Sequence, residues 1–534
     1  MPESVLLKDL ADEVRNQYKI VAAKVNGQLK ELTSYIDSKD KIEFIDLTNM
    51  DGIRIYQRGL SYLLIRATKE IYPDMELKIS HSLSKGLFFE VYYGDISLTK
   101  KHVKKIKKRM EEIVKEDEEF LKVKVSRQKA KKLFNQMNME TKTDLLDYRK
   151  YCYINLYKNG DMQKYFFGYM VPSTGYLNIF DLTFYSGGII LRHPTINTPN
   201  SIPDFIESPN IAQIFSEYTE WAKIHNCNYV SNLNNIIKNN NQKDLILLSE
   251  ALHSRKIIEI ADKITKNNKR VILVAGPSSS GKTTFAKRLK TQLKVNGVNP
   301  VMLSTDDYFV SRDQTPIDEN GEYDFESIEA VDLELFNKHL NDLLQGKKVE
   351  IPSFNFEKGK KNYNGDFLQI DKDQPIIIEG IHGLNPKLTF DVFEKEKFKI
   401  YISALTQLNI DKHNRIPTTD ARLIRRIVRD NNYRGISVQE TINRWASVRR
   451  GEEKNIFPYQ EDADIMFNSA IVYELAIMKK HVEPLLLQIT KGEKAYLEAK
   501  RLLKFLQYFE TIDDDSLVPR NSILKEFIGD SIYR

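Results

Sequence analysis

Short apolar runs alternate with helical segments in the second half of the chain. RVILVAG (270–276), PVMLST (300–305) and PIIIEG (375–380) are apolar or β-branched runs bounded by turn-forming or acidic residues, the pattern of strands buried in a parallel sheet. KTTFAKRLKTQLKVNG (282–297) and TTDARLIRRIVRDNNYRG (418–435) have helical spacing and end at glycine. This half is therefore predicted to be an α/β domain with a parallel sheet wrapped by helices.

The first half has a different pattern. YKIVAAKVNGQLKELTSYIDSKDKIEFIDL (18–47) alternates apolar and polar residues around an Asn-Gly turn, which predicts a small β-rich module. KKHVKKIKKRMEEIVKEDEEFLKVKVSRQKAKK (100–132) begins with a strongly basic stretch. We interpret this stretch as one long solvent-facing helix stabilised by ion pairs four residues apart.

A linker region separates the two halves. INTPNSIPDFIESPN (196–210) and NNIIKNNNQ (234–242) concentrate Pro, Asn and Ser, which favour turns over long regular elements. Between them IAQIFSEYTEWAKIHN (211–226) has helical periodicity, and DLILLSEALHSRKIIEIADKITKN (244–267) predicts a helix that leads into the second half.

Composition narrows the class of protein. A chain of 534 residues is expected to hold two or three domains. Its excess of six positive charges is too small for a dedicated nucleic-acid binder and allows only local basic patches. Cys152 and Cys227 are the two cysteines, which fits a reducing compartment. Since no apolar run reaches the roughly 18 residues needed to span a bilayer, we expect a cytoplasmic protein with no membrane partner.

The segment GPSSSGKTT (276–284) lies between the first predicted strand and the helix that follows it. It completes the pattern G-x-x-x-x-G-K-T in the strand-loop-helix context that a phosphate-binding loop requires. Lys282 would neutralise charge on the β- and γ-phosphates, and Thr283 would offer an oxygen to Mg²⁺. The predicted nucleotide-binding residues are Gly276, Ser278, Ser279, Ser280, Gly281, Lys282, Thr283 and Thr284.

Acidic residues follow two other predicted strands. Asp306 and Asp307 come after PVMLST, and Glu379 ends PIIIEG. Because ligands of open α/β sheets bind beyond the carboxyl ends of the strands, these carboxylates are expected to face the phosphates. Asp306 is a candidate base, and Thr283, Glu379 and Asp306 are candidate partners of Mg²⁺.

Arginines gather on one face of the last predicted helix. Arg422, Arg425, Arg426 and Arg429 occupy offsets 0, 3, 4 and 7, and Arg434 follows on the turn. Taken alone, such a face is usually only solvated. After a phosphate loop, it is what a closing lid needs to neutralise a phosphoryl group in transfer.

Six motifs of the second half occur in an order known from one kinase family. They are GPSSSGKTT, LSTDDYF, YDFESIEAVDLELF, IPSFNF, IIIEGIHGL and DARLIRRIVRDNNYRG. Residues 270 to about 475 thereby resemble the uridine/cytidine kinase branch of the uridine kinase and phosphoribulokinase superfamily. The resemblance implies ATP and Mg²⁺ as cofactors and a nucleoside 5′-hydroxyl as acceptor. It makes Asp306 the catalytic aspartate, assisted by Lys282, Arg426 and Arg429.

The acceptor pocket departs from this family. The family's pyrimidine-binding Tyr and His correspond to Phe354 and Gly359, so base selectivity is open although Phe354 can still stack on a base. The ribose-binding acid corresponds to Asp324 or Glu326, and the register does not choose between them. The family's Arg-Gly-Arg is reduced to Arg434-Gly435-Ile436. With Tyr308, the candidate substrate residues are Asp324, Glu326, Phe354 and Arg434.

The first half carries a second resemblance. KEIYPD (69–74) and VPSTG (171–175), with the segments around them, resemble the N-terminal part of threonyl-tRNA synthetases, a TGS domain followed by an editing-type domain. The family's editing residues correspond to Arg58, Tyr62, Phe166 and Met170, none of which can form its metal or general-base site. The resemblance therefore implies a non-editing module that binds an RNA partner or a regulatory ligand.

These predictions combine into one architecture. We expect an α/β P-loop kinase domain with a parallel sheet, preceded by a small β-rich TGS-like module and an α+β editing-like domain. The predicted boundaries are 1–50 (TGS-like), 51–200 (synthetase second-domain-like), 201–255 (linker and connecting helices), 256–480 (kinase) and 481–534 (C-terminal helical segment). The last segment either completes the kinase core or forms a homo-oligomer contact.

Three functions follow from the sequence. The first is an ATP-dependent nucleoside kinase, with uridine or cytidine as the first acceptor to test. The second is an RNA-binding or regulatory protein in which the phosphate loop acts as a nucleotide switch. The third keeps the kinase and changes the acceptor to another sugar or small alcohol.

Overall fold

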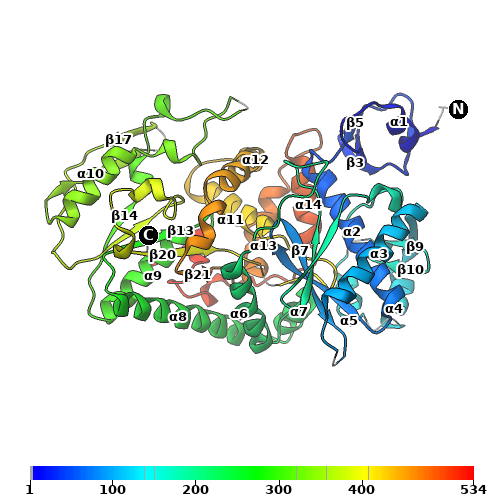
Figure 1. Ribbon diagram of the computed structural model, residues 1–534, viewed down its shortest axis with the longest axis horizontal. Coiled ribbons are helices and arrows are strands. Elements are labelled where there is room, and N and C mark those ends of the chain that lie inside the picture. Colours follow the sequence, from blue (N-terminus) through cyan, green and yellow to red (C-terminus); the bar gives the residue numbers. More distant parts are fainter. Residues whose placement is uncertain are drawn as a thin grey trace.

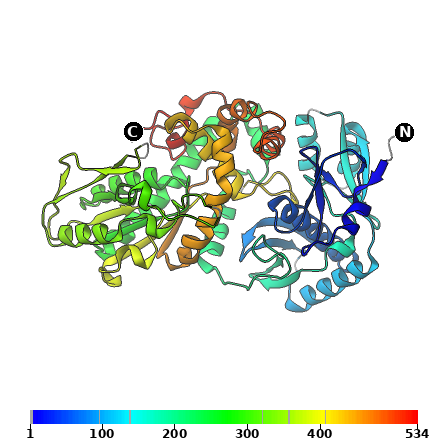
Figure 2. The same cartoon turned by 90° about the horizontal axis from the view of Figure 1, so that it is seen from above.

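The structure, a computed structural model, describes residues 4–94, 96–136, 139–149, 151–319, 321–355, 358–406 and 408–533. The N-terminal modules lie at one end of the molecule and the sheet of the second half lies at the other (Figures 1 and 2). Helices α11, α13 and α14 lie between the two ends, and α6, α7 and α8 run along one side (Figure 1). The described residues contain no helix long and apolar enough to cross a membrane.

The first module is small and β-rich, as predicted. Strand β2 (Ala22–Val25) pairs antiparallel with β3 (Gln28–Glu31) and β5 (Ile42–Ile45). Asn26 and Gly27 join β2 to β3 with φ angles of 50° and 73°, the two left-handed residues that a tight type I′ hairpin requires. The module also contains α1 (Leu7–Glu13) and the pair β1 (Ser4–Leu6) and β4 (Tyr35–Asp37).

The second module combines helices with two antiparallel sheets. The long helix α2 (Met50–Ile71) packs with α3 (Lys100–Glu116) over a common core. One sheet has the order β11-β12-β7-β6 and the other β10-β9-β8. Their strands are β6 (Glu76–Leu83), β7 (Gly86–Tyr92), β8 (Leu121–Ser126), β9 (Tyr153–Asn159), β10 (Met162–Lys164), β11 (Asp181–Tyr185) and β12 (Gly188–Arg192).

The prediction of one long helix over residues 100–132 is wrong. Helix α3 ends at Glu116, because Asp117 adopts a left-handed conformation with φ 49°. The chain then forms strand β8 and a separate helix, α4 (Arg127–Gln136). One face of α3 is also buried, through Val103 and Ile106 among others, so the helix is amphipathic rather than solvated all round.

Helices connect the two halves. They are α6 (Pro209–His225), α7 (Val230–Lys238) and α8 (Gln242–Asn267), whereas α5 (Glu140–Leu145) lies in the second module between β8 and β9. The helices predicted over 211–226 and 244–267 are therefore present. Helix α8 continues through the predicted boundary at residue 255, and α13 (Glu474–Leu486) through that at residue 480, so neither boundary coincides with a break in regular structure.

Five parallel strands form the sheet of the second half, in the order β14-β19-β13-β20-β21. Alternate residues of β13 enter different cores: Ile272 and Val274 pack with α8 and α9, whereas Val271 and Leu273 pack with α10. The sheet is thus covered on both faces, as its apolar strands predict. The strands are β13 (Val271–Ala275), β14 (Val301–Ser304), β19 (Ile376–Glu379), β20 (Lys397–Ser403) and β21 (Ile465–Asn468).

The remaining helices complete this half. They are α9 (Lys282–Val295), α10 (Leu333–Leu344), α11 (Thr418–Tyr433), α12 (Val438–Asn455), α13, α14 (Tyr496–Leu506) and α15 (Lys525–Ile528). Leu502 of α14 and Phe527 of α15 are buried in the same core as α9 and α11. Of the two roles expected for the C-terminal segment, completion of this core is the one that the packing supports.

Candidate functional site

The phosphate loop, residues 276–284, joins the central strand β13 to the start of α9. Gly281 has φ 83° immediately before the helix, a conformation that favours glycine. At Gly276 a Cβ atom would lie 2.1 Å from the carbonyl oxygen of Ile402 on β20. Both glycines are thus required by the backbone. The Lys282 ammonium donates to the Pro277 carbonyl at 3.3 Å and so lies folded over the loop.

The predicted carboxylates lie at the ends of neighbouring strands. Glu379 ends β19, which lies between β14 and β13 in the sheet, and Asp306 lies in the short helix that follows β14. The Thr283 hydroxyl donates to Glu379 Oε1 at 2.5 Å. Burial raises the pKa of Glu379 to about 7; the charge of Lys282 opposes this rise and that of Asp306 adds to it. The structure therefore brings together Lys282, Thr283, Asp306 and Glu379.

This group of side chains suits a magnesium ion held jointly with a nucleotide. Among the described residues there is no cluster of three or more His, Cys, Asp or Glu side chains that could hold a metal. Mg²⁺ in kinases is held by one or two carboxylates, with substrate phosphates and water completing the shell. The buried carboxyl of Glu379 beside the Thr283 hydroxyl fits that mode, because a cation would stabilise its ionised form.

The raised pKa of Glu379 predicts a pH-dependent magnesium requirement. Below pH 7, protons compete with Mg²⁺ for the Glu379 carboxylate. The Mg²⁺ concentration that produces half of the full effect of Mg²⁺ on ADP binding should therefore rise by up to about tenfold for each pH unit below 7. Calorimetric titrations at pH 6, 7 and 8 measure this half-saturating Mg²⁺ concentration. Glu326 titrates in the same range, so Glu379→Gln is the variant that identifies the group. A pH dependence that persists in Glu379→Gln would contradict the assignment.

Of the two candidate ribose-binding acids, Glu326 is the one near the phosphate loop. Burial and the neighbouring Glu452 raise the pKa of Glu326 to about 7, and Lys282 and Arg426 act on it in the opposite direction. Its Oε2 atom is buried without a hydrogen-bond partner among the described residues. Asp324 instead accepts the backbone N–H of Glu326 at 3.2 Å. Asp324 therefore holds the turn, and Glu326 offers a buried acceptor.

The other candidate substrate residues lie in different environments. The Phe354 ring, on β16 (Ser353–Asn355), is 5.7 Å from the ring of Phe309. Burial and Arg429 lower the pKa of Arg434 to about 10, and Asp306 is among the charges acting on it. The prediction that Tyr308 contacts the substrate is not supported by its position. Its side chain is fully buried, and its hydroxyl lies 3.2 Å from Nδ1 of His339. Tyr308 is a core residue and presents no surface to a substrate.

Two of the four arginines of α11 do not form an open lid. Arg422 and Arg425 are completely buried. Arg422 donates from Nε and Nη2 to the Ser278 carbonyl at 3.0 and 2.9 Å, and Arg425 donates to the Ser469 carbonyl at 2.9 Å. Their charges are neutralised by the buried carboxylates of Glu452 and Glu474. These two arginines therefore hold the phosphate loop and its neighbour in place.

Of the other two arginines, Arg426 keeps the predicted orientation toward the loop. Arg426 donates from Nη1 to the Ser278 hydroxyl at 2.9 Å, so its guanidinium lies at the rim of the loop. Arg429 pairs with Asp430 at 2.7 Å. Burial lowers the pKa of Arg426, and the neighbouring positive charge of Arg429 lowers it further.

The sequence did not single out three residues around the loop. Glu452 of α12 accepts the backbone N–H of Ser278 at 3.2 Å, and Glu526 of α15 accepts from Thr284. His382 is buried, and burial lowers its pKa to about 4. Of these three residues, His382 alone could have been singled out from the sequence, because it lies in IHGL (381–384), directly after the strand that ends at Glu379. The two glutamates reach the loop from distant helices.

In the N-terminal half, the positions that correspond to editing residues are filled by packed side chains. Tyr62, Phe166 and Met170 are buried in one core, and the rings of Tyr62 and Phe166 are 5.7 Å apart. The Tyr62 hydroxyl donates to the Tyr157 carbonyl at 3.2 Å. Arg58 donates to the carbonyl of Tyr169. These positions do converge in space, but they form a packed cluster and not the metal or general-base site of the editing motif.

A loop of the second half is held by the N-terminal half. This junction loop, residues 404–417, connects β20 to the arginine helix α11. Ile79 donates its N–H to the Lys412 carbonyl at 2.9 Å, and Phe167 donates its N–H to Asn414 Oδ1 at 2.7 Å. Lys142 lies 3.6 Å from Asp411, with both side chains buried. The two halves thus meet at the segment that precedes the arginines of the site.

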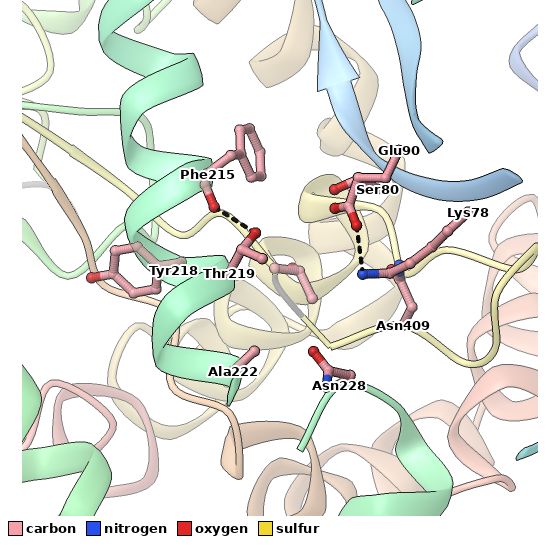
Figure 3. Close-up of a pocket in the computed structure, with 10 residues that line it drawn as sticks. Lys78, Ser80, Glu90, Phe215, Tyr218, Thr219, Ala222, Asn228 and Asn409 are labelled. Atoms are coloured by element: carbon pink, nitrogen blue, oxygen red, sulfur yellow. Dashed lines mark hydrogen bonds and ion pairs between the residues drawn. The ribbon is translucent and has the colours of Figure 1, made fainter. Parts of the chain in front are cut away.

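A small cavity of about 30 Å³ lies at this junction (Figure 3). Thr406 and Asn409 of the junction loop line it, with the Lys78–Glu90 ion pair of 3.1 Å from the N-terminal half. Helix α6 lines another side through Phe215 and neighbouring residues. His81, which follows the lining residue Ser80, is packed: its ring stacks on that of Phe215 with ring centroids 3.6 Å apart. The space suffices for one or two water molecules.

Comparison with known families confirms both resemblances. Residues 271–476 match the family model described as Phosphoribulokinase / Uridine kinase family. This region is a P-loop kinase fold, with the five-stranded parallel sheet predicted for it. A solved structure described as a possible uridine kinase from Bacillus stearothermophilus aligns with 40% of this chain and 98% of its own, at 21% identity and a TM-score of 0.28.

The first half is similar to threonine–tRNA ligases. That of Syntrophotalea carbinolica is 29% identical over 168 residues, which are 31% of this chain and 26% of the ligase. Threonine–tRNA ligase 2 of Bacillus subtilis is 27% identical over 189 residues, which are 35% of this chain and 30% of the ligase. The chain therefore spans between a quarter and a third of the length of these relatives.

Proposed function

We propose that the protein is an ATP-dependent nucleoside kinase, which transfers the γ-phosphate of ATP to the 5′-hydroxyl of a uridine- or cytidine-like acceptor. The supporting observation is the convergence of Lys282, Thr283, Asp306 and Glu379 where β13, β14 and β19 end. In this proposal the residues from Gly276 to Thr284 bind the phosphates and Asp306 orients and deprotonates the acceptor hydroxyl. When bound by Thr283, Glu379 and Asp306, Mg²⁺ would neutralise charge on the phosphates.

The proposal assigns the arginines and the acceptor residues as follows. Arg426 and Arg429 neutralise charge on the transferring phosphoryl group, together with Lys282. Glu326 accepts hydrogen bonds from the ribose hydroxyls, and its unpaired, buried Oε2 supports that role. Phe354 stacks on the base. An acceptor that lacks a ribose-like diol would leave Glu326 unpaired, which is costly in a buried site.

A regulatory role for the N-terminal half is the second part of the proposal. It rests on the junction loop, because the hydrogen bonds that fix this loop come from Ile79 and Phe167 of that half. We propose that this half, with a TGS-like module over residues 1–50 and a synthetase-like domain over 51–200, binds an RNA or a regulatory ligand in the cytoplasm. If nucleotide binding occurs without phosphotransfer, the phosphate loop would serve as a switch for that binding.

The proposed reaction is tested by ADP release from Mg²⁺-ATP against a panel of nucleosides, sugars and small alcohols. We expect uridine or cytidine to stimulate release, and Lys282→Ala to abolish the stimulation. Phe354→Ala should raise the KM for the nucleoside by about 5- to 150-fold, since stacking on an aromatic ring contributes about 1–3 kcal/mol, and should leave the KM for ATP unchanged. Phe354→Tyr is the matched control that keeps the ring.

Each alternative has its own outcome in this panel. If a sugar or alcohol stimulates ADP release and no nucleoside does, the protein is a kinase whose acceptor is not a nucleoside. If no compound of the panel stimulates ADP release although the protein binds ATP, the result would favour a phosphate loop that acts as a nucleotide switch. In that case tRNA binding should depend on ATP and fall steeply with salt concentration.

A further inference from the structure

The C-terminal segment, residues 522–533, lies directly against the phosphate loop. A Cβ atom on Gly281 would lie 2.4 Å from Cγ2 of Ile523, so the Ile523 side chain packs directly against the backbone of the loop. Lys287 of α9 donates to the Tyr533 carbonyl at 2.6 Å, and the Arg425 guanidinium lies 5.1 Å from the centroid of the Phe527 ring. Any nucleotide bound to the loop would have this segment as a neighbour.

A carboxylate of this segment occupies two hydrogen-bond donors of the loop. Oε2 of Glu526 accepts the backbone N–H of Thr284 at 3.1 Å and the Thr284 hydroxyl at 2.6 Å. Thr284 is the third residue of α9, so its N–H has no partner within the helix. An N–H and a hydroxyl at the positive end of a helix are donors that suit a phosphate group. Glu526 is thus an internal anion in a position suited to a phosphate.

The negative charge of Glu526 also acts on the predicted magnesium site. It is one of the negative charges that raise the pKa of Glu379. A local helix cap comes from the residue just before the helix, whereas Glu526 is 242 residues away in sequence. The contact therefore connects the C-terminal segment to the centre of the site.

We propose that Glu526 is an autoinhibitory carboxylate that competes with a nucleotide phosphate for Thr284, an inference that rests on the nucleotide site of the proposed function. Both anions need the same two donors and repel each other at contact distance. A nucleotide can bind there only after the Glu526 side chain moves aside. The C-terminal segment then responds to occupancy of the loop, and any partner that withdraws the segment would raise nucleotide affinity.

The test is calorimetric binding of ADP, without Mg²⁺, to the full chain and to Glu526→Gln and Glu526→Ala. We expect the affinity for ADP to rise about tenfold in Glu526→Ala and less in Glu526→Gln, because the amide oxygen still accepts the Thr284 donors without the charge. Asp513→Asn is the matched control. It removes one negative charge from an exposed position of the C-terminal region and should change ADP affinity less than twofold.

Two results would overturn the inference. One is an unchanged or weaker ADP affinity in both Glu526 variants while thermal unfolding shows them folded, which would make Glu526 a purely structural cap. The other is amide hydrogen exchange over residues 522–533 that does not change when ADP binds to the wild-type chain. Since no acceptor is present, these results do not depend on the identity of the acceptor. Absence of ADP binding to every variant would instead refute the nucleotide site itself.

Discussion

Asparagine in place of Asp306 is expected to lower kcat by about 10²- to 10⁴-fold, the usual contribution of a positioned general base. The amide keeps the size of the side chain but cannot take the proton of the acceptor hydroxyl. The KM for ATP should rise far less than kcat falls, because Thr283 and Glu379 would still hold Mg²⁺ and the phosphate loop is a separate segment that begins at the end of β13. Steady-state kinetics with the acceptor identified in the nucleoside panel measure both constants.

Two neighbouring aspartates serve as controls for this substitution. Asp313→Asn makes the same chemical change on an exposed turn and should leave kcat within twofold. Asp307→Asn changes the adjacent carboxyl, whose pKa is raised by burial. If Asp307→Asn abolished turnover while Asp306→Asn retained more than a tenth of it, the role of base would pass to Asp307.

The convergence of Lys282, Thr283, Asp306 and Glu379 was predictable from sequence because each part is local. The phosphate loop is a contiguous motif between a strand and a helix, and Asp306 and Glu379 each follow an apolar run. Since strands of a parallel sheet end at one edge, the three segments had to meet there. The Asn26-Gly27 hairpin was predictable for the same reason, since two adjacent residues determine the turn.

Other features depended on partners far along the chain. The spacing of Arg422 and Arg425 correctly placed them on one helical face, but it could not show that Glu452 and Glu474 would bury that face. The charged segment 100–132 was interpreted from its ion-pair spacing. That spacing contains no information about the left-handed conformation of Asp117, which ends α3, or about the pairing of β8 with β9. Glu526 lies in a short helix whose sequence suggests no contact with Thr284.

The buried pair of Arg422 and Glu452 leads to the largest expected effect on stability. Both side chains are almost completely buried, and each also bonds to the Ser278 backbone. Removal of Arg422 leaves the buried Glu452 carboxylate paired with Arg449, a partly exposed side chain 2.9 Å away, and takes away its better-buried partner. Arg422→Ala should therefore lower the free energy of unfolding by about 3 kcal/mol, the lower end of the range for a broken buried pair.

Urea-induced unfolding of the full chain measures this loss, and the exposed pair of Arg444 and Glu440 provides the comparison. These two residues of α12 are 2.8 Å apart with about half of each side chain exposed, so Arg444→Ala should cost about 0–1 kcal/mol. Joint replacement of Arg422 and Glu452 by Met and Leu should recover most of the stability. It should not recover ADP affinity, because the Ser278 carbonyl and N–H both lose their partners. Equal losses in Arg422→Ala and Arg444→Ala would show that the buried pair does not hold the phosphate loop.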